Sequence, residues 1–227
     1  MKYFILAFTI LFIFSCRNKK ILQLPEVSKS EITDIKDLSH AYLFYDETQT
    51  DSVELNRKNL ISTTNWLINV DKRLTLKQAI PHIKYLQSKK ANSSHKNKNA
   101  KNYFTCNDTL INNLGFMEFT NISYHIEDEP DYFKHNKKQQ LIGTIYVNTL
   151  NDIHLSLIEE GHSQIEAPFG ISNLNKKLKE LNSEFELPVF INFNSNISFQ
   201  DYITVKSHLS KLNWKYITIS ENEFISN

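Results

Sequence analysis

The second half of the chain shows a regular alternation of strand and helix patterns, which limits the folds it can adopt. Short runs rich in β-branched and aromatic residues predict strands, and apolar residues at helical spacing between them predict helices. Two serines at the starts of these helices, Ser172 and Ser198, are expected to cap them. The patterns predict strands at 141–149, 153–158, 187–193 and 214–219, and helices at 171–181 and 199–212. The resulting order, β-β-α-β-α-β, favours a small α+β domain.

Two motifs in this half carry a family resemblance. The segments Pro188-Val-Phe-Ile-Asn-Phe-Asn194 and Ser198-Phe-Gln-Asp-Tyr202 resemble the central strand and the following helix start of the periplasmic domain of the ExbD/TolR family of biopolymer transport proteins. The resemblance covers about residues 141–225. The family usually has Ala-Asp where this chain has Phe193-Asn194, and a glycine where it has Asn213. The resemblance implies the fold of that module, and it suggests TonB- or Tol-type proteins or peptidoglycan as partners.

The first half contains a weaker version of the same pattern. Residues 66–80 align without gaps on residues 189–203, at a shift of 123, with Thr75 at the position of Ser198. Strands are predicted at 41–45, 65–70, 103–106, 114–120 and 122–126, a helical turn at 32–38, and a helix from Leu74 that contains Pro81. Any strand-turn-helix unit would share part of this pattern. We expect two α+β modules, 31–126 and 141–227, joined by a charged linker at 127–140, with the first module a candidate divergent repeat.

The N-terminus reads as a lipoprotein signal. Lys2 is followed by twelve apolar or nearly apolar residues, which would form a helix of roughly 18 Å, shorter than the hydrocarbon core of about 30 Å. Ile13-Phe14-Ser15-Cys16 resembles a bacterial lipobox, which implies removal of residues 1–15 and acylation of Cys16 by diacylglycerol and then a further chain such as palmitate. The alternative is a short transmembrane anchor with an incidental cysteine. Residues 16–30 are predicted to form a tether.

The same segment bears on motor activity. Members of the ExbD/TolR family carry a transmembrane helix with one Asp that couples to proton flow. Residues 2–15 contain no acidic residue, and an ionisable group in the membrane is what would mark proton coupling. The resemblance therefore implies the fold of the periplasmic domain without the proton-driven activity of the family.

Composition narrows the function classes. Without Lys2 the chain has 25 basic and 25 acidic side chains, so we expect no nucleic-acid binding. After acylation of Cys16, Cys106 is the remaining cysteine, so no intrachain disulfide is expected. The four glycines speak against glycine-rich phosphate loops. Residues 88–101 are basic and polar, which indicates a solvated loop or, alternatively, a patch for phosphate or anionic lipid.

No catalytic or metal motif is convincing, and no cofactor is expected. His162-Ser163 suggests a nucleophile and base, but adjacent residues on an extended segment point to opposite faces. Glu159-Glu160 are interpreted as solvated charges at a strand end, and Asn192 and Asn194 as turn-forming residues. His125 and His135 flank an acidic stretch whose spacing matches no known metal pattern, so a charged linker is preferred.

We therefore expect a non-enzymatic, lipid-anchored cell-envelope protein that faces the periplasm from the inner or outer membrane. Its ExbD/TolR-like module would bind a partner by adding an extended peptide to an exposed sheet edge, as an accessory to envelope transport. It would act as a homodimer or as an internal pseudo-dimer. The alternatives are an envelope hydrolase with an unrecognised site and a lipoprotein of generic α+β fold unrelated to transport.

Overall fold

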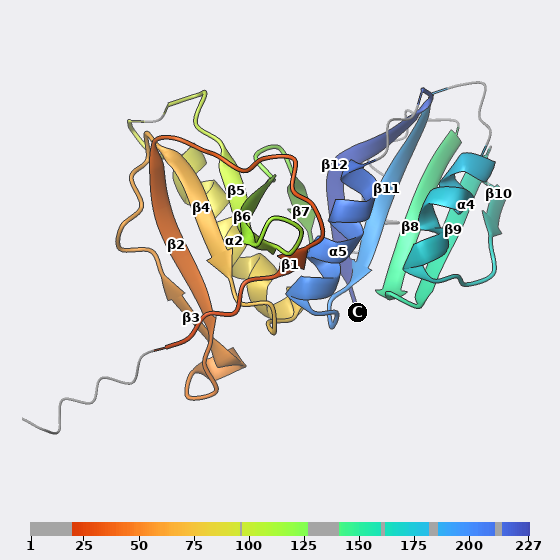
Figure 1. The fold of residues 1–227 in the computed structure, drawn as a ribbon. Coiled ribbons are helices and arrows are strands. Elements are labelled where there is room, and N and C mark those ends of the chain that lie inside the picture. The colour runs from red at the N-terminus through yellow and green to blue at the C-terminus, as the bar shows by residue number, and fades with distance from the viewer. Residues whose placement is uncertain (1–19, 96, 127–140, 160–161, 182–185, 212–214) are drawn as a thin grey trace, which may run out of the picture.

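The computed structural model describes residues 20–95, 97–126, 141–159, 162–181, 186–211 and 215–227. This part of the chain forms two six-stranded sheets and three α-helices, so the predicted α+β class agrees with the mixed α/β architecture observed (Figure 1). Within these residues, no helix combines the length and the apolar character needed to cross a membrane.

The first sheet is built around three parallel strands. Its order is β1-β5-β4-β2-β3, and β6 also pairs with β5. Strands β2, β4 and β5 are parallel, whereas β3 is antiparallel to β2 and β6 is antiparallel to β5. The elements are β1 (Glu26–Val27), β2 (Leu38–Tyr45), the 3-10 turn η1 (Thr50–Ser52), β3 (Val53–Asn56), β4 (Asn65–Val70), α2 (Leu76–Ala91), β5 (Asn102–Asp108) and β6 (Asn113–Glu118).

The second sheet has the order β10-β9-β8-β11-β12-β7. Strands β8, β11 and β12 are parallel, and β9 is antiparallel to β8. The elements are β7 (Ser123–His125), β8 (Leu141–Thr149), β9 (Asp152–Glu159), β10 (His162–Ile165), η2 (Ile171–Asn173), α4 (Leu174–Glu180), β11 (Leu187–Asn194), α5 (Phe199–Ser210) and β12 (Ile217–Ser226). The predicted order lacks β10, which extends the β8–β9 hairpin.

The two sheets share one connectivity. A hairpin (β2–β3 or β8–β9) is followed by a central strand (β4 or β11), a helix (α2 or α5) and a further parallel strand (β5 or β12). In both sheets the first hairpin strand pairs with the central strand, which in turn pairs with the last strand. The second sheet differs by the additional β10 and α4.

The turn between central strand and helix is held by the same hydrogen bonds in both halves. An Asp or Asn at the end of the strand accepts from the backbone N–H two residues on, and a hydroxyl caps the N3 amide of the helix. The bonds are Arg73 N to Asp71 Oδ1 (3.1 Å), Asn196 N to Asn194 Oδ1 (2.8 Å), Gln78 N to Thr75 Oγ1 (3.3 Å) and Asp201 N to Ser198 Oγ (3.1 Å). Each pair of donors and each pair of acceptors lies 123 residues apart.

These two turns also bind each other. The first two backbone amides of each helix have no intrahelical partner, and each pair donates to carbonyls of the other module's turn. The bonds are Leu76 N to Ile197 O (3.0 Å), Phe199 N to Leu74 O (2.7 Å), Lys77 N to Ser195 O (2.8 Å) and Gln200 N to Lys72 O (3.2 Å). Each bond has a counterpart shifted by 123 residues with the two halves exchanged, so the contact has an approximate two-fold relation. Each module therefore completes the helix start of the other.

The core is continuous between the halves. One cluster of buried apolar side chains includes residues of both sheets and of all three α-helices. Phe199, the first residue of α5, packs edge-on against Phe104 of β5 at 5.1 Å between ring centroids. Phe119 stacks on the same Phe104 ring at 3.9 Å. Helix α5 lies between the first sheet and its own sheet (Figure 1), so its apolar residues serve both.

One helical prediction is wrong, and another places the start of its helix too early. Residues 32–38 form no helix, because Asp37 adopts a left-handed conformation (φ 55°) directly before β2, and Ile32 bridges to Phe116 of β6. The predicted helix at 171–181 begins later, at Leu174. The amide of Ile171 donates to Leu150 O (2.7 Å) and fixes a 3-10 turn, in which Ser172 makes no capping bond.

Three boundaries also differ from the sequence-based expectation. The last strand continues past residue 219 to Ser226, because its buried Glu223 is paired with Lys206. Strand β7 was expected in the first module, but it pairs with β12 of the second sheet. Within the expected tether 16–30, Glu26 and Val27 form β1, and the side-chain amide of Gln200 binds the Glu26 backbone (2.8 and 3.0 Å).

The capping bonds make a stability prediction. Replacing Thr75 or Ser198 by Ala should each lower the free energy of unfolding by about 1 kcal/mol, since one helix amide loses its acceptor. Ser172→Ala is the matched control and should cost less than about 0.5 kcal/mol, because its hydroxyl caps no helix. Urea unfolding measures all three, and an equal loss in the three variants would contradict the assignment.

Candidate functional site

Several residues considered from the sequence fall outside the described ranges. These are Cys16 and the signal, the linker 127–140 with His135, and Glu160. Of the residues considered for metal binding, His125 is described: its Nε2 lies 2.9 Å from Asn222 Oδ1, and its ring stacks on Phe224. In the described part of the chain, no group of three or more His, Cys, Asp or Glu residues is arranged to hold a metal ion.

The remaining candidates occupy structural positions. His162 and Ser163 are consecutive residues of β10, paired with Glu159 and Ile158 of β9. Asn194 forms the turn described above, as expected. Asn192 instead accepts a hydrogen bond from the Ser226 hydroxyl (2.7 Å), which ties β11 to the end of β12.

Cys106 lies in β5 and is almost completely buried. Burial is the main cause that raises the pKa of its thiol to about 12, with a smaller contribution from Asp108. The thiolate is the nucleophilic form of cysteine, and a raised pKa suppresses it. Cys106 therefore serves as a small apolar residue of the core.

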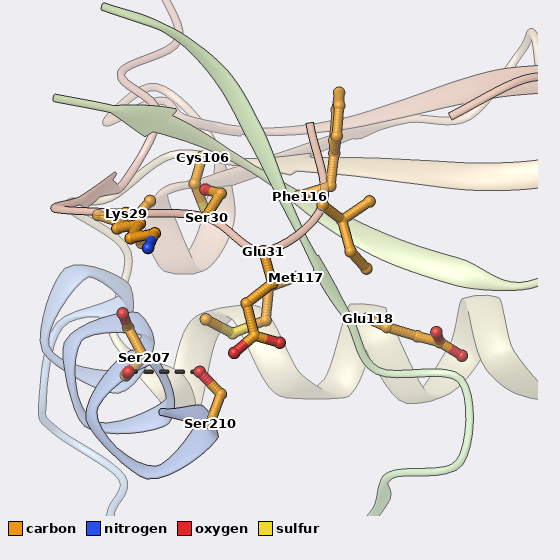
Figure 2. A pocket seen from close by; sticks show the side chains of 11 residues that line it. Lys29, Ser30, Glu31, Cys106, Phe116, Met117, Glu118, Ser207 and Ser210 are labelled. Carbon is orange, nitrogen blue, oxygen red and sulfur yellow. Dashed lines mark hydrogen bonds between the residues drawn. The ribbon is translucent and has the colours of Figure 1, made fainter. Parts of the chain in front are cut away.

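A cavity of about 270 Å³ lies beside Cys106, between β6, the segment after β1, and α5 (Figure 2). Figure 2 shows Ser207 and Ser210 of α5 on one side and Lys29 and Glu31 on the N-terminal segment. Its charged side chains are of both signs, and its thiol is unreactive. The cavity therefore shows no preference for a charged ligand.

A buried charged network around α5 joins the two halves. Glu223 of β12 is fully buried, and its carboxylate accepts from the Tyr202 hydroxyl (2.9 Å) and forms an ion pair with Lys206. The Tyr202 hydroxyl lies 3.1 Å from that of Tyr124, which belongs to β7. Burial raises the pKa of both tyrosines well above the ordinary value, so both stay neutral. The network is enclosed, so it holds β7, α5 and β12 together.

A second charged feature lies at the C-terminal half of α2. Lys90 is 8% exposed, and its ammonium donates to Lys101 O and to Asn102 Oδ1, both at 2.9 Å. The same nitrogen lies 5.1 Å from the centroid of the Trp66 ring, a cation–π arrangement. A cavity of about 490 Å³ opens beside it, between α2 and the chain around Thr120 to Tyr124.

The third feature is the outer edge of β3. In the second sheet the equivalent strand, β9, is covered by β10, but in the described part of the first sheet no strand pairs with the outer side of β3. The carbonyl of Leu43 in β2 accepts a hydrogen bond from the backbone amide of Asp71 (2.9 Å), on the side of β4. Leu43 and its partner Leu55 therefore form a non-hydrogen-bonded pair, and the N–H and C=O of Leu55 face the open edge.

The comparisons with known proteins give no relative: no family model, no curated protein and no solved structure matches the chain.

Sequence reasoning missed Lys90, Lys206 and Glu223, although two of them leave a signal. Lys90 follows Ile83 and Leu86 at helical spacing, so it interrupts the apolar face of α2. Lys206 lies one turn after Tyr202 on the buried side of α5. A charged residue on the apolar face of a helix indicates a buried ion-pair partner or a binding site. This signal can be read from the sequence alone.

The buried pair predicts an asymmetric effect of mutation. Lys206→Met should lower the free energy of unfolding by about 3 kcal/mol, because it leaves the Glu223 carboxylate buried without its cation. Lys101→Met is the matched control, since the Lys101–Glu118 pair is exposed, and it should cost less than about 1 kcal/mol. Urea unfolding at neutral pH measures both, and equal costs would show that the carboxylate does not depend on Lys206.

Proposed function

We propose that this chain is a non-enzymatic, lipid-anchored envelope protein that binds an extended segment of a partner protein along the edge of β3. Its two modules form an internal pseudo-dimer of ExbD/TolR-like units, and the partner is of the TonB or Tol type. The observation that carries the binding function is the open edge of β3, at the position that β10 covers in the other sheet.

The two-fold contact of the helix starts supports the pseudo-dimer. Closed two-fold contacts are the usual way in which identical subunits associate, with the same patch on both sides. Here the contact joins residues 123 apart in one chain, and the halves share strand order and connectivity. A duplicated module is the simplest origin of such an arrangement.

Strand addition supplies a mechanism for partner binding. The outward N–H and C=O of Leu55 are free to pair with an extended peptide, which would gain the backbone bonds that β9 gives to β10. Such bonds give affinity without requiring a particular sequence, and side chains flanking the edge give specificity. The charged side chains of Glu54, Arg57 and Lys58 lie at or next to this strand.

The position of Lys20 relates this edge to the membrane. Lys20 forms ion pairs with Asp46 and Glu54, at the β2–β3 hairpin. Four residues after Cys16, Lys20 lies at most about 14 Å from it along the chain. A lipid on Cys16 would therefore hold the β3 edge close to the membrane surface.

The anchor can be tested with the chain's own second cysteine as control. Cells fed a fatty-acid analogue should label the wild type and Cys106→Ala equally, and Cys16→Ala not at all, because the lipobox cysteine is the acceptor. In-gel fluorescence measures the label. Equal labelling of Cys16→Ala would refute acylation at this residue.

Partner binding at β3 can be tested with a photo-crosslinking amino acid at Asn56. We expect an adduct in cells whose partner peptide, mapped by mass spectrometry, comes from an extended segment. The same amino acid at Lys176, an exposed position on α4, should give no such adduct.

The same experiment separates backbone pairing from side-chain contact. Leu55→Pro removes the outward N–H and should abolish the adduct at Asn56, whereas Leu55→Ala keeps that donor and should retain it. An adduct that survives Leu55→Pro, or that forms equally from Lys176, would rule out strand addition at this edge.

A further inference from the structure

The cavity beside Lys90 differs in its charge from the cavity beside Cys106, which has acidic and basic side chains. It is lined by Lys84, Lys90 and uncharged residues, and none of its described lining residues is a carboxylate. Ser88, Ser123 and Asn97 also line it, and their side chains can donate hydrogen bonds. Its volume of about 490 Å³ lies within the range of small-molecule sites, roughly 300–1,000 Å³.

The acidic side chains that contact residues of this region are already engaged: the Glu223 carboxylate, behind Tyr124 and Tyr202, is paired with Lys206. Glu118 pairs with Lys101 (2.8 Å) and accepts from the Thr120 hydroxyl (2.9 Å). Glu221 accepts from the Asn121 amide (3.0 Å). Among the described residues, neither Lys84 nor Lys90 has a carboxylate partner within ion-pair distance.

Lys90 is held in place by groups that do not neutralise it. Two of its three ammonium protons are used by Lys101 O and Asn102 Oδ1, and the Trp66 face lies alongside. A buried cation without a counter-charge is costly, and an anionic ligand would supply the missing charge. A fixed ammonium at a cavity wall is a common element of anion sites.

We propose that this cavity binds a phosphate or sulfate group, with Lys90 and Lys84 as its cationic contacts. The group belongs either to a small phosphorylated molecule or to the headgroup of an anionic phospholipid, since both present the same oxyanion. The site lies between α2 and residues 120–124 and shares no lining residue with the cavity along β3, so it does not depend on the proposed partner binding.

The protonation of Lys90 gives the site a pH dependence. Burial lowers the pKa of Lys90 to about 8. The other titratable side chains that line the cavity are Lys84 on α2 and Tyr124 on β7. Behind Tyr124 lie Tyr202 and the Glu223–Lys206 pair, and the Lys101–Glu118 pair lies next to the carbonyl that Lys90 binds. An anion stabilises the charged ammonium and raises this pKa, so affinity should fall as the pH rises above 8.

Trp66 reports on binding directly. In the full chain purified in detergent, Trp214→Phe leaves Trp66 as the single tryptophan. Titration with sulfate, whose charge is constant over the range used, should change Trp66 fluorescence in a saturable manner at pH 7. The apparent affinity should be at least about tenfold weaker at pH 9.5.

Variants assign the contacts. Lys90→Met and Lys84→Met, each on the Trp214→Phe background, should weaken sulfate binding by about tenfold or more at pH 7, as expected for loss of a charged hydrogen bond. Lys89→Met removes the same charge from the adjacent exposed position and should leave the affinity unchanged within about twofold. A thermal-melting measurement checks that each variant is folded.

Two further probes distinguish the sources of the anion. If pyrophosphate competes with sulfate and the protein does not bind to vesicles, the ligand is a small phosphorylated molecule. Binding to phosphatidylglycerol vesicles but not to phosphatidylcholine vesicles, lost in Lys90→Met and kept in Lys89→Met, indicates a lipid headgroup. Absence of saturable sulfate binding, or equal binding by Lys90→Met and Lys89→Met, would overturn the proposal.

Discussion

The rest of the structure depends on four backbone hydrogen bonds between the starts of two helices. A helix begins with amides that no residue of the helix can satisfy, and burying such amides without acceptors costs about 1–3 kcal/mol each. In α2 and α5 the third amide is satisfied by a hydroxyl of its own module, but the first two donate to the turn of the other module. Neither turn is complete alone, and the common core around Phe104 and Phe199 forms where the turns meet.

Around this shared centre the two modules use buried charge differently. In the second module, Glu223 is compensated by Lys206 and by a tyrosine hydroxyl, and the network fixes β7 of the first half to β12. In the first module, the Lys90 ammonium donates only to neutral acceptors and lies over the face of an aromatic ring. The network around Glu223 is closed and structural, whereas the contacts of Lys90 leave a positive charge beside an open cavity. The two halves therefore present different surfaces on a shared strand order.

Much of this fold follows from the sequence, and the failures have identifiable causes. Local signals predict β8, β11, α5 and the caps Thr75 and Ser198, because apolar periodicity and hydroxyl caps act within a few residues. The end of β12 was missed because Ser220-Glu-Asn-Glu223 is polar, and its strand conformation depends on Lys206 in another element. The same limit hides the candidate sites. The edge of β3 and the cavity beside Lys90 exist only once distant segments meet.

The exchanged amides also constrain how the chain folds during synthesis. The first 126 residues leave the ribosome before Ser195 and Ile197 exist, so the start of α2 waits for acceptors more than a hundred residues away. Strand β7 waits longer still, because its neighbour β12 is the last element made. The first module must therefore remain incomplete through most of translation.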